Sequence, residues 1–459
     1  MREKLKKLAL VFMALCLLAM TAAPANVKAA DEVALSETKV TLRVGDTAEL
    51  KLNNVSWDQT VTWSTNKKAI ATVEVREWDS STAKIHVKKK GTAKITAKVD
   101  KKKYICTVTV KKFALSHTKG KNAKDVKALK AIIKKQNLKG ATLPTDLDEA
   151  PVYYDYGYRW DEKGNLTGIY WNRSNLQGSL FLEEFTSLTS LFCEGNQLSS
   201  LDVSKNTALT ELSCGDNRLS TLDVSKNTAL NYLDCWGNQL SELDVSKNTA
   251  LTRLSCWDNQ LSELDVNKNT ALTELSCNSN QLTSLDVSKN MALRELFCRG
   301  NRLSILNVSK NTALIRLDCQ YNQLSELNVG KNTVLTNLNC RGNQLSRLDV
   351  SGCTELTWLN CRENQLSELD VSKNTALSSL YCEENQLSKL DLSKNTALTW
   401  LICQDNQLSE LDVSENTALA ELDCDGNQLT TLDVSKNTAL WSLRCDDNVK
   451  VTGYTGERW

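Results

Sequence analysis

The most regular feature of the chain is a hydrophobic pattern that returns every 21 residues from position 188 onward. The unit reads L-x-x-L-x-C-x-x-N-x-L-x-x-L-D-V-S-x-N-T-x, and residues 209–229 are one copy. Residues 166–187 form a looser copy with Ile169 at a leucine place and Trp171 at the cysteine place. Alternate residues of a strand lie on opposite faces, so the leucine and cysteine of L-x-C share the inward face. The pattern therefore predicts a solenoid whose successive turns pair through parallel strands.

Thirteen copies carry a cysteine at the inward place. They are Cys193, Cys214, Cys235, Cys256, Cys277, Cys298, Cys319, Cys340, Cys361, Cys382, Cys403, Cys424 and Cys445. A disulfide ladder, a metal site and a redox centre are alternatives to a column of buried free thiols. Parallel strands lie about 4.8 Å apart, which exceeds the usual Cβ separation in a disulfide. A linear column also gives no convergent ligands for a metal. We expect buried free thiols with a structural role, and neither a metal nor a cofactor.

Two further positions of the repeat carry expectations. Asn196, Asn217 and Asn238 follow the strand, and we expect their amides to bind backbone groups in their own and the next repeat. Asn227 has a short polar side chain suited to local turn bonding on the far side. Cys353 replaces the equivalent asparagine in SGCTEL, and we expect it to be partly exposed on a turn.

The repeats vary most at the outward strand positions, where aromatic and arginine side chains gather. Interfaces favour these residue types, and exposed tryptophan is seldom neutral for solubility. We interpret these positions as a binding face on the concave sheet for a protein or a polysaccharide. The alternative is sequence drift at surface positions of a copied repeat. The candidate residues are Phe192, Tyr232, Trp236, Trp257, Phe297, Arg299, Arg316, Tyr321, Arg341, Trp358, Arg362, Tyr381, Trp400 and Trp441.

Residues 31–112 carry a different pattern, that of short strands with a period of two. In TAKITAKV, Ala93, Ile95, Ala97 and Val99 alternate with polar residues, and about seven such strands suggest a β-sandwich. The segments VTLRVGDTAEL, VTWSTNKKAIATVE and KKGTAKITAKV resemble a bacterial immunoglobulin-like domain of group 2. The resemblance implies that Trp63 belongs to the core and that Cys106 is a buried thiol on the last strand.

The remaining segments complete the domain organisation. Residues 1–30 have a basic start and an apolar run, which is typical of a secretory signal peptide. Residues 113–165 connect the two repeating patterns, and 122–137 predict an amphipathic helix that covers the first turn of the solenoid. The repeats occupy 166–448, and 449–459 are expected to form a tail. After signal cleavage we expect no transmembrane segment.

Charge is distributed unevenly along the chain. Residues 31–140 hold 25 Lys and Arg against 11 Asp and Glu, whereas residues 141–459 hold 26 against 43. A nucleic-acid reader would need a basic face, and the solenoid is acidic. The basic first module favours contact with an anionic cell envelope, although two differently solvated surfaces would look the same.

The spacing L-x-x-L-x-C-x-x-N-x-L is the leucine-rich-repeat signature, and the chain resembles secreted bacterial leucine-rich-repeat proteins of the internalin-like kind. The LDVSxNTA half of the unit departs from the internalin pattern, so a shared partner does not follow. The resemblance implies a secreted or cell-surface adhesion protein without catalysis, and no catalytic motif stands out. The alternatives are a structural spacer at the envelope and a carbohydrate-active accessory protein.

Overall fold

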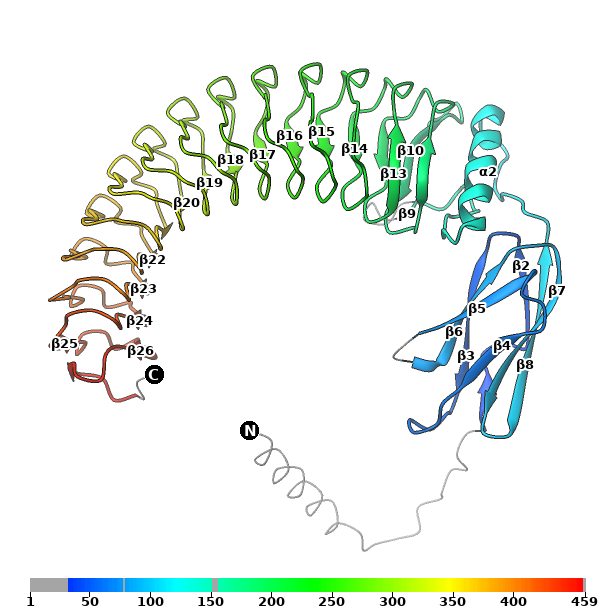
Figure 1. The fold of residues 1–459 in the computed structure, drawn as a ribbon, viewed down its shortest axis with the longest axis horizontal. Coiled ribbons are helices and arrows are strands. Elements are labelled where there is room, and N and C mark those ends of the chain that lie inside the picture. The colour runs from blue at the N-terminus through cyan, green and yellow to red at the C-terminus, as the bar shows by residue number, and fades with distance from the viewer. Residues whose placement is uncertain (1–31, 77–78, 151–155, 457–459) are drawn as a thin grey trace, which may run out of the picture. The chain divides into compact units, whose positions relative to one another are not determined.

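The structure, a computed structural model, describes residues 32–76, 79–150 and 156–456 (Figure 1). The predicted signal peptide at 1–30 lies outside these residues. The chain divides into two compact units, Met1–Lys112 and Phe113–Trp459, which are described in turn.

The first unit consists of two four-stranded sheets, with strand orders β1-β3-β6-β5 and β2-β8-β7-β4. All pairs are antiparallel except β2 with β8. The bounds are β1 Ala34–Leu35, β2 Lys39–Arg43, β3 Thr47–Asn53, β4 Thr62–Thr65, β5 Ala71–Arg76, β6 Asp79–Val87, β7 Gly91–Val99 and β8 Lys102–Lys111.

The two sheets share a hydrophobic core, which confirms the predicted sandwich. Leu52 from one sheet packs with Ala97 and Val99 from the other. Trp63 is half-buried against this cluster, and its indole Nε1 donates to the Ser80 carbonyl over 2.9 Å. Cys106 is fully buried and free.

The second unit begins with helix α2, Ala123–Leu138, which closes the first turn of the solenoid. Asn122 caps the helix, since its side chain accepts from the backbone N–H groups of residues 124 and 125. Leu129 and Ile133 lie on the buried face and belong to the same core as the repeats. Asp125 accepts from the Leu166 N–H over 2.9 Å and so ties the helix to the first repeat strand. The helix lies one residue later than the predicted range 122–137, and its buried face packs in the same core as the repeats.

The solenoid carries one 15-stranded sheet, which runs in sequence order from β9 and β10 to β26 and leaves out β11, β13 and β25. β9 pairs antiparallel with β10, and every later pair is parallel with a register of 21 or 22 residues. The sheet follows the inner side of the curved array (Figure 1). The first bounds are β9 Tyr156–Trp160, β10 Leu166–Trp171, β12 Ser190–Phe192, β14 Glu211–Ser213, β15 Tyr232–Asp234, β16 Arg253–Ser255 and β17 Glu274–Ser276. The others are β18 Glu295–Phe297, β19 Arg316–Asp318, β20 Asn337–Asn339, β21 Trp358–Asn360, β22 Ser379–Tyr381, β23 Trp400–Ile402, β24 Glu421–Asp423 and β26 Ser442–Arg444.

The outer side is built mainly from turns. Two short parallel pairs lie there near the two ends of the array, β11 Gln177–Phe181 with β13 Gln197–Asp202 and β25 Thr431–Asp433 with β27 Lys450–Thr452. In most repeats an aspartate accepts from the N–H two residues later, as Asp223 does from Ser225 over 2.9 Å. Asn307 makes the same bond in its own repeat.

The end of the repeat array lies further along the chain than the sequence predicts. Val449 is buried in the common core, and β27 pairs with β25 of the preceding repeat. The boundary at 448 is therefore wrong, because 449–452 complete the last outer turn rather than starting a tail.

Candidate binding face

The cysteine column lies inside the array and holds no disulfide. All thirteen column cysteines are buried and free. Burial raises the pKa of the Cys193, Cys277 and Cys361 thiols to about 12. A thiol with such a pKa is protonated at neutral pH, so it is neither a nucleophile nor a metal ligand there. The cysteine side chains therefore fill the hydrophobic core beneath the sheet.

The first asparagine column binds the turn after each strand. Asn217 Nδ2 donates to the carbonyls of Cys193 and Cys214 over 3.0 and 3.1 Å, and its Oδ1 accepts from the Leu198 N–H over 2.9 Å. Asn196 and Asn238 make equivalent bonds. The second partner repeat is thus the preceding one, whereas the sequence analysis placed it after.

A second asparagine column, which includes Asn227, links neighbouring repeats. Only local turn bonding is predicted there from the sequence. Asn227 is fully buried, and its Nδ2 donates to the carbonyls of Val203 and Asn206 over 3.0 and 2.8 Å. It links two repeats rather than bonding locally. Cys353 occupies this column, is fully buried, and has its sulfur 3.4 Å from the Val329 carbonyl oxygen. The expectation that Cys353 is partly exposed is therefore wrong, because the column runs through the interior.

The inner face is the solvent side of the long sheet together with the two residues after each column cysteine. At its N-terminal end, Tyr170 and Phe192 stack with ring centroids 5.2 Å apart, and Phe192 and Tyr232 with centroids 6.5 Å apart. Tyr170 is fully buried and Phe192 is 9% exposed. Phe192 was expected to be open to a partner; it is instead covered, because its neighbours close over it.

Trp236 and Trp257 form a stacked pair with centroids 4.5 Å apart and planes 4° from parallel. This separation matches the spacing of adjacent strands, so the rings stack along the array and turn their edges outward. Gly215 makes room for the pair, since a Cβ there would lie 2.4 Å from the Trp236 ring. Both indoles are half-buried.

Three consecutive repeats build an arginine–tyrosine–arginine sandwich. The guanidinium carbons of Arg299 and Arg341 lie 5.6 and 5.1 Å from the Tyr321 ring centroid. Tyr321 has a φ of +54° and remains 37% exposed. Such a conformation is unusual for a bulky residue, and Gly342 leaves space for the ring, since a Cβ there would approach it to 2.6 Å.

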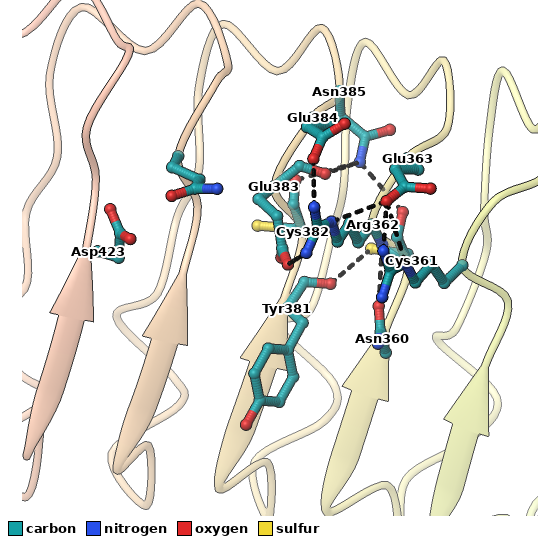
Figure 2. A network of polar contacts seen from close by, with 12 residues as sticks. Asn360, Cys361, Arg362, Glu363, Tyr381, Cys382, Glu383, Glu384, Asn385 and Asp423 are labelled. Atoms are coloured by element: carbon teal, nitrogen blue, oxygen red, sulfur yellow. Dashed lines mark hydrogen bonds and ion pairs between the residues drawn. The ribbon is translucent and has the colours of Figure 1, made fainter.

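A network of arginine and glutamate side chains lies next to this sandwich, in the repeats that follow it along the chain (Figure 2). Arg341 and Arg362 both contact Glu363, with nitrogen–oxygen distances of 2.6 and 3.0 Å. Arg362 also pairs with Glu383 and Glu384. Glu383 is only 4% exposed, and burial raises the pKa of its carboxyl. The repeat pattern alone does not indicate this network, because it depends on the position of Arg362 one repeat before Glu383.

The remaining candidates are spread over the face. Trp358 and Tyr381 have ring centroids 5.8 Å apart, and Trp400 donates from Nε1 to Glu421 over 2.7 Å. Arg316 pairs with Glu295 over 3.4 Å, Phe297 is half-buried on β18, and Trp441 is exposed just before β26. The structure thus brings ten of the candidates together in four groups and leaves Phe297, Arg316, Trp400 and Trp441 as single side chains. The aspartates Asp234, Asp318 and Asp423 also line this face, and burial raises the pKa of each carboxyl.

Together these features define a leucine-rich-repeat solenoid whose interior carries a cysteine column and whose inner face carries preassembled aromatic and arginine groups. The functional domain of InlJ from Listeria monocytogenes, which is described as including a cysteine ladder, is 39% identical. The match covers 62% of this chain and 69% of that one, with a TM-score of 0.59. The chain therefore belongs to the internalin-like leucine-rich-repeat proteins.

Two further structures share the fold. A leucine-rich-repeat protein of Leptospira interrogans is 23% identical over 61% of this chain and 77% of that one, with a TM-score of 0.56. The internalin InlF of Listeria monocytogenes is 21% identical over 64% and 86%, with a TM-score of 0.50. No family model and no curated protein matches the sequence. In the part of the chain that the structure describes, no helix has the length and apolar character needed to cross a membrane.

Proposed function

We propose that the chain is a secreted or cell-surface protein that binds a partner protein on the inner face of its solenoid. The observation that carries this proposal is the preassembly of the face. Trp236 with Trp257, and Tyr321 with its two arginines, are already held in place by contacts between repeats. Side chains that are ordered before binding lose little entropy on association, and aromatic and arginine groups dominate interface energies.

The ring geometry favours a protein over a glycan. Sugars stack on open aromatic faces, but Trp236 has one face against Trp257 and the other against Gly215. Phe192 is likewise covered on its faces by Tyr170 and Tyr232. What these groups present is ring edges, indole N–H groups and guanidinium groups, which suit the mixed polar and apolar surface of a protein.

The proposal is one of binding without catalysis. The column thiols are protonated, and the buried carboxyl of Glu383 faces Arg362 rather than a second acid or a nucleophile. We also propose that residues 31–112 are a bacterial immunoglobulin-like domain of group 2, on the strength of the sequence resemblance. The predicted signal peptide supports export.

A binding comparison tests the proposal. The chain from residue 31 onward is applied to arrays of extracellular proteins and of glycans, beside a variant with Trp236→Ala, Trp257→Ala and Tyr321→Ala. The matched control carries Phe181→Ala and Ile305→Ala, two exposed apolar residues outside the inner face. We expect saturable protein binding that the inner-face variant loses by at least about 30-fold, near 2 kcal/mol, and that the control retains. Binding to glycans alone, or equal binding by both variants, would refute the proposal, and no binding at all would favour the spacer.

A further inference from the structure

One tryptophan lies outside every group described so far. Trp57 is 97% exposed, whereas the other exposed large hydrophobic side chains of the described residues range from 37% to 66%. It stands in the loop 54–61 between β3 and β4 of the first unit. A fully solvated indole contributes nothing to the core of the sandwich, so its position has no explanation in folding.

The loop of Trp57 lies beside the hairpin that joins β7 and β8. Gln59 Nε2 donates to Asp100 Oδ2 over 2.7 Å, which ties the two loops together. The base of the loop is fixed as well, since Val55 and Val61 pack in the core cluster with Val99. Trp57 is therefore carried on an anchored loop at a defined end of the sandwich.

The same end carries a concentration of lysine. Lys101 lies in the β7–β8 turn and Lys102 and Lys103 begin β8; all three are exposed, and Lys98 is exposed one residue before the end of β7. The acidic residues at this end are not confined to one side. Asp58 follows the tryptophan, Asp100 is engaged by Gln59, Glu32 lies beside Asn54, and Asp79 begins β6, where it accepts from Ser81 and Thr82. Around the β7–β8 hairpin itself, four exposed lysines stand against Asp100, so this side of the tip is cationic.

We propose that this tip, the Trp57 loop with the 101–103 lysines, docks reversibly on the surface of an anionic lipid bilayer. Lysine is attracted to anionic headgroups within a Debye length of the surface. The indole prefers the boundary between headgroups and acyl chains because one part of the ring system is apolar and its N–H is polar. Lysines alone would serve any polyanion, and it is the exposed tryptophan that favours a lipid surface. A single tryptophan at the membrane surface binds weakly. The lysines, which contact the same surface at the same time, strengthen the binding.

Vesicle cosedimentation tests the proposal with the chain from residue 31 onward, which retains every described residue of both units. The vesicles are phosphatidylcholine with and without phosphatidylglycerol, at low and high salt. Trp57→Ala should weaken binding about tenfold, and Lys101→Gln, Lys102→Gln and Lys103→Gln together about 100-fold. Trp57 and the lysines are exposed, so these variants should keep the fold, which far-UV circular dichroism verifies.

The chain offers matched controls for both changes. Lys88, Lys89 and Lys90 form an exposed lysine triplet at the opposite end of β7, and Phe181 is an exposed aromatic residue of the second unit outside the inner face. Replacing these residues in the same way should leave vesicle binding within about twofold. The proposal is overturned if the unaltered chain ignores anionic vesicles, or if the control triplet matters as much as the tip triplet. It is also overturned if Trp57→Ala binds normally while the lysine variant does not, since that result describes a polyanion site instead.

Discussion

Alanine at Asn238 should destabilise the solenoid strongly, because this side chain is fully engaged. Its Oδ1 accepts from the Leu219 N–H over 2.9 Å, and its Nδ2 lies 3.1 Å from the carbonyl oxygens of Cys214 and Cys235. Removing it leaves a buried N–H without a partner, at about 1–3 kcal/mol. The two lost donor bonds add about 1 kcal/mol each. The expected loss in the free energy of unfolding is about 4 kcal/mol.

Alanine at Asn248, in the second column of the same repeat, should cost less. Its Nδ2 donates to the carbonyls of Val224 and Asn227 over 3.0 and 2.8 Å, worth about 1 kcal/mol each. Its Oδ1, however, is buried without a hydrogen-bond partner, so removing it recovers about 1 kcal/mol. The expected net loss is about 1 kcal/mol.

The two variants remove the same atoms ten residues apart, so the loss of side-chain volume cancels in the comparison. Urea unfolding followed by far-UV circular dichroism gives the two free energies, provided that the slopes agree with the unaltered chain. Repeat arrays can unfold in parts, so hydrogen exchange at the Leu219 amide serves as the local readout. Equal losses, or a larger loss for Asn248→Ala, would refute the assignment of unequal hydrogen bonding to the two columns.

Three other outcomes follow from the structure. The column thiols, with the pKa of Cys193 at about 12, should react with a thiol reagent at pH 8 only as the chain unfolds; rapid labelling of the native chain would contradict the burial. Gly215→Ala should push the Trp236 ring out of its stack and lower stability by about 1–3 kcal/mol, and an unchanged near-ultraviolet circular dichroism spectrum would argue against the stack. Hydrogen bonds from serine hold the pKa of Asp223 and Asp244 below its ordinary value, so this stabilisation is present at neutral pH and lost as the pH falls through the folded-state pKa. Replacing both by asparagine should keep the turns and move the acid-unfolding midpoint to lower pH, as acid titration can measure.

The architecture of the solenoid was predictable because each repeat has the same pattern of inward and outward residues. Alternation placed leucine and cysteine inward, and the constant period fixed the parallel register. The direction of the Asn217 bonds was not predictable, because a period of 21 relates a residue equally to the repeats before and after it. The burial of Asn227 had no clear signal, because its place is asparagine in eleven of twelve copies while the adjacent lysine and serine places are each kept in ten.

The candidate face was predictable in composition but not in exposure. Phe192 and Trp236 were found as outward strand residues, yet their exposure depends on what stands one or two repeats away. Tyr170 belongs to the loosest copy, where Trp171 replaces the cysteine, and its contact with Phe192 could not be read from the consensus. A repeat pattern describes what every turn shares, whereas these contacts arise from what the turns do not share.

The two asparagine columns make the repeat interchangeable. Each asparagine reaches into the repeat before it, so nearly every junction between turns is chemically the same junction. If one 21-residue unit were removed or duplicated, the repeats on either side would meet at a junction of the same kind. The same asparagine hydrogen bonds would form there. The length of the array, and with it the reach of the inner sheet, can therefore change in whole turns while the interior stays as it is.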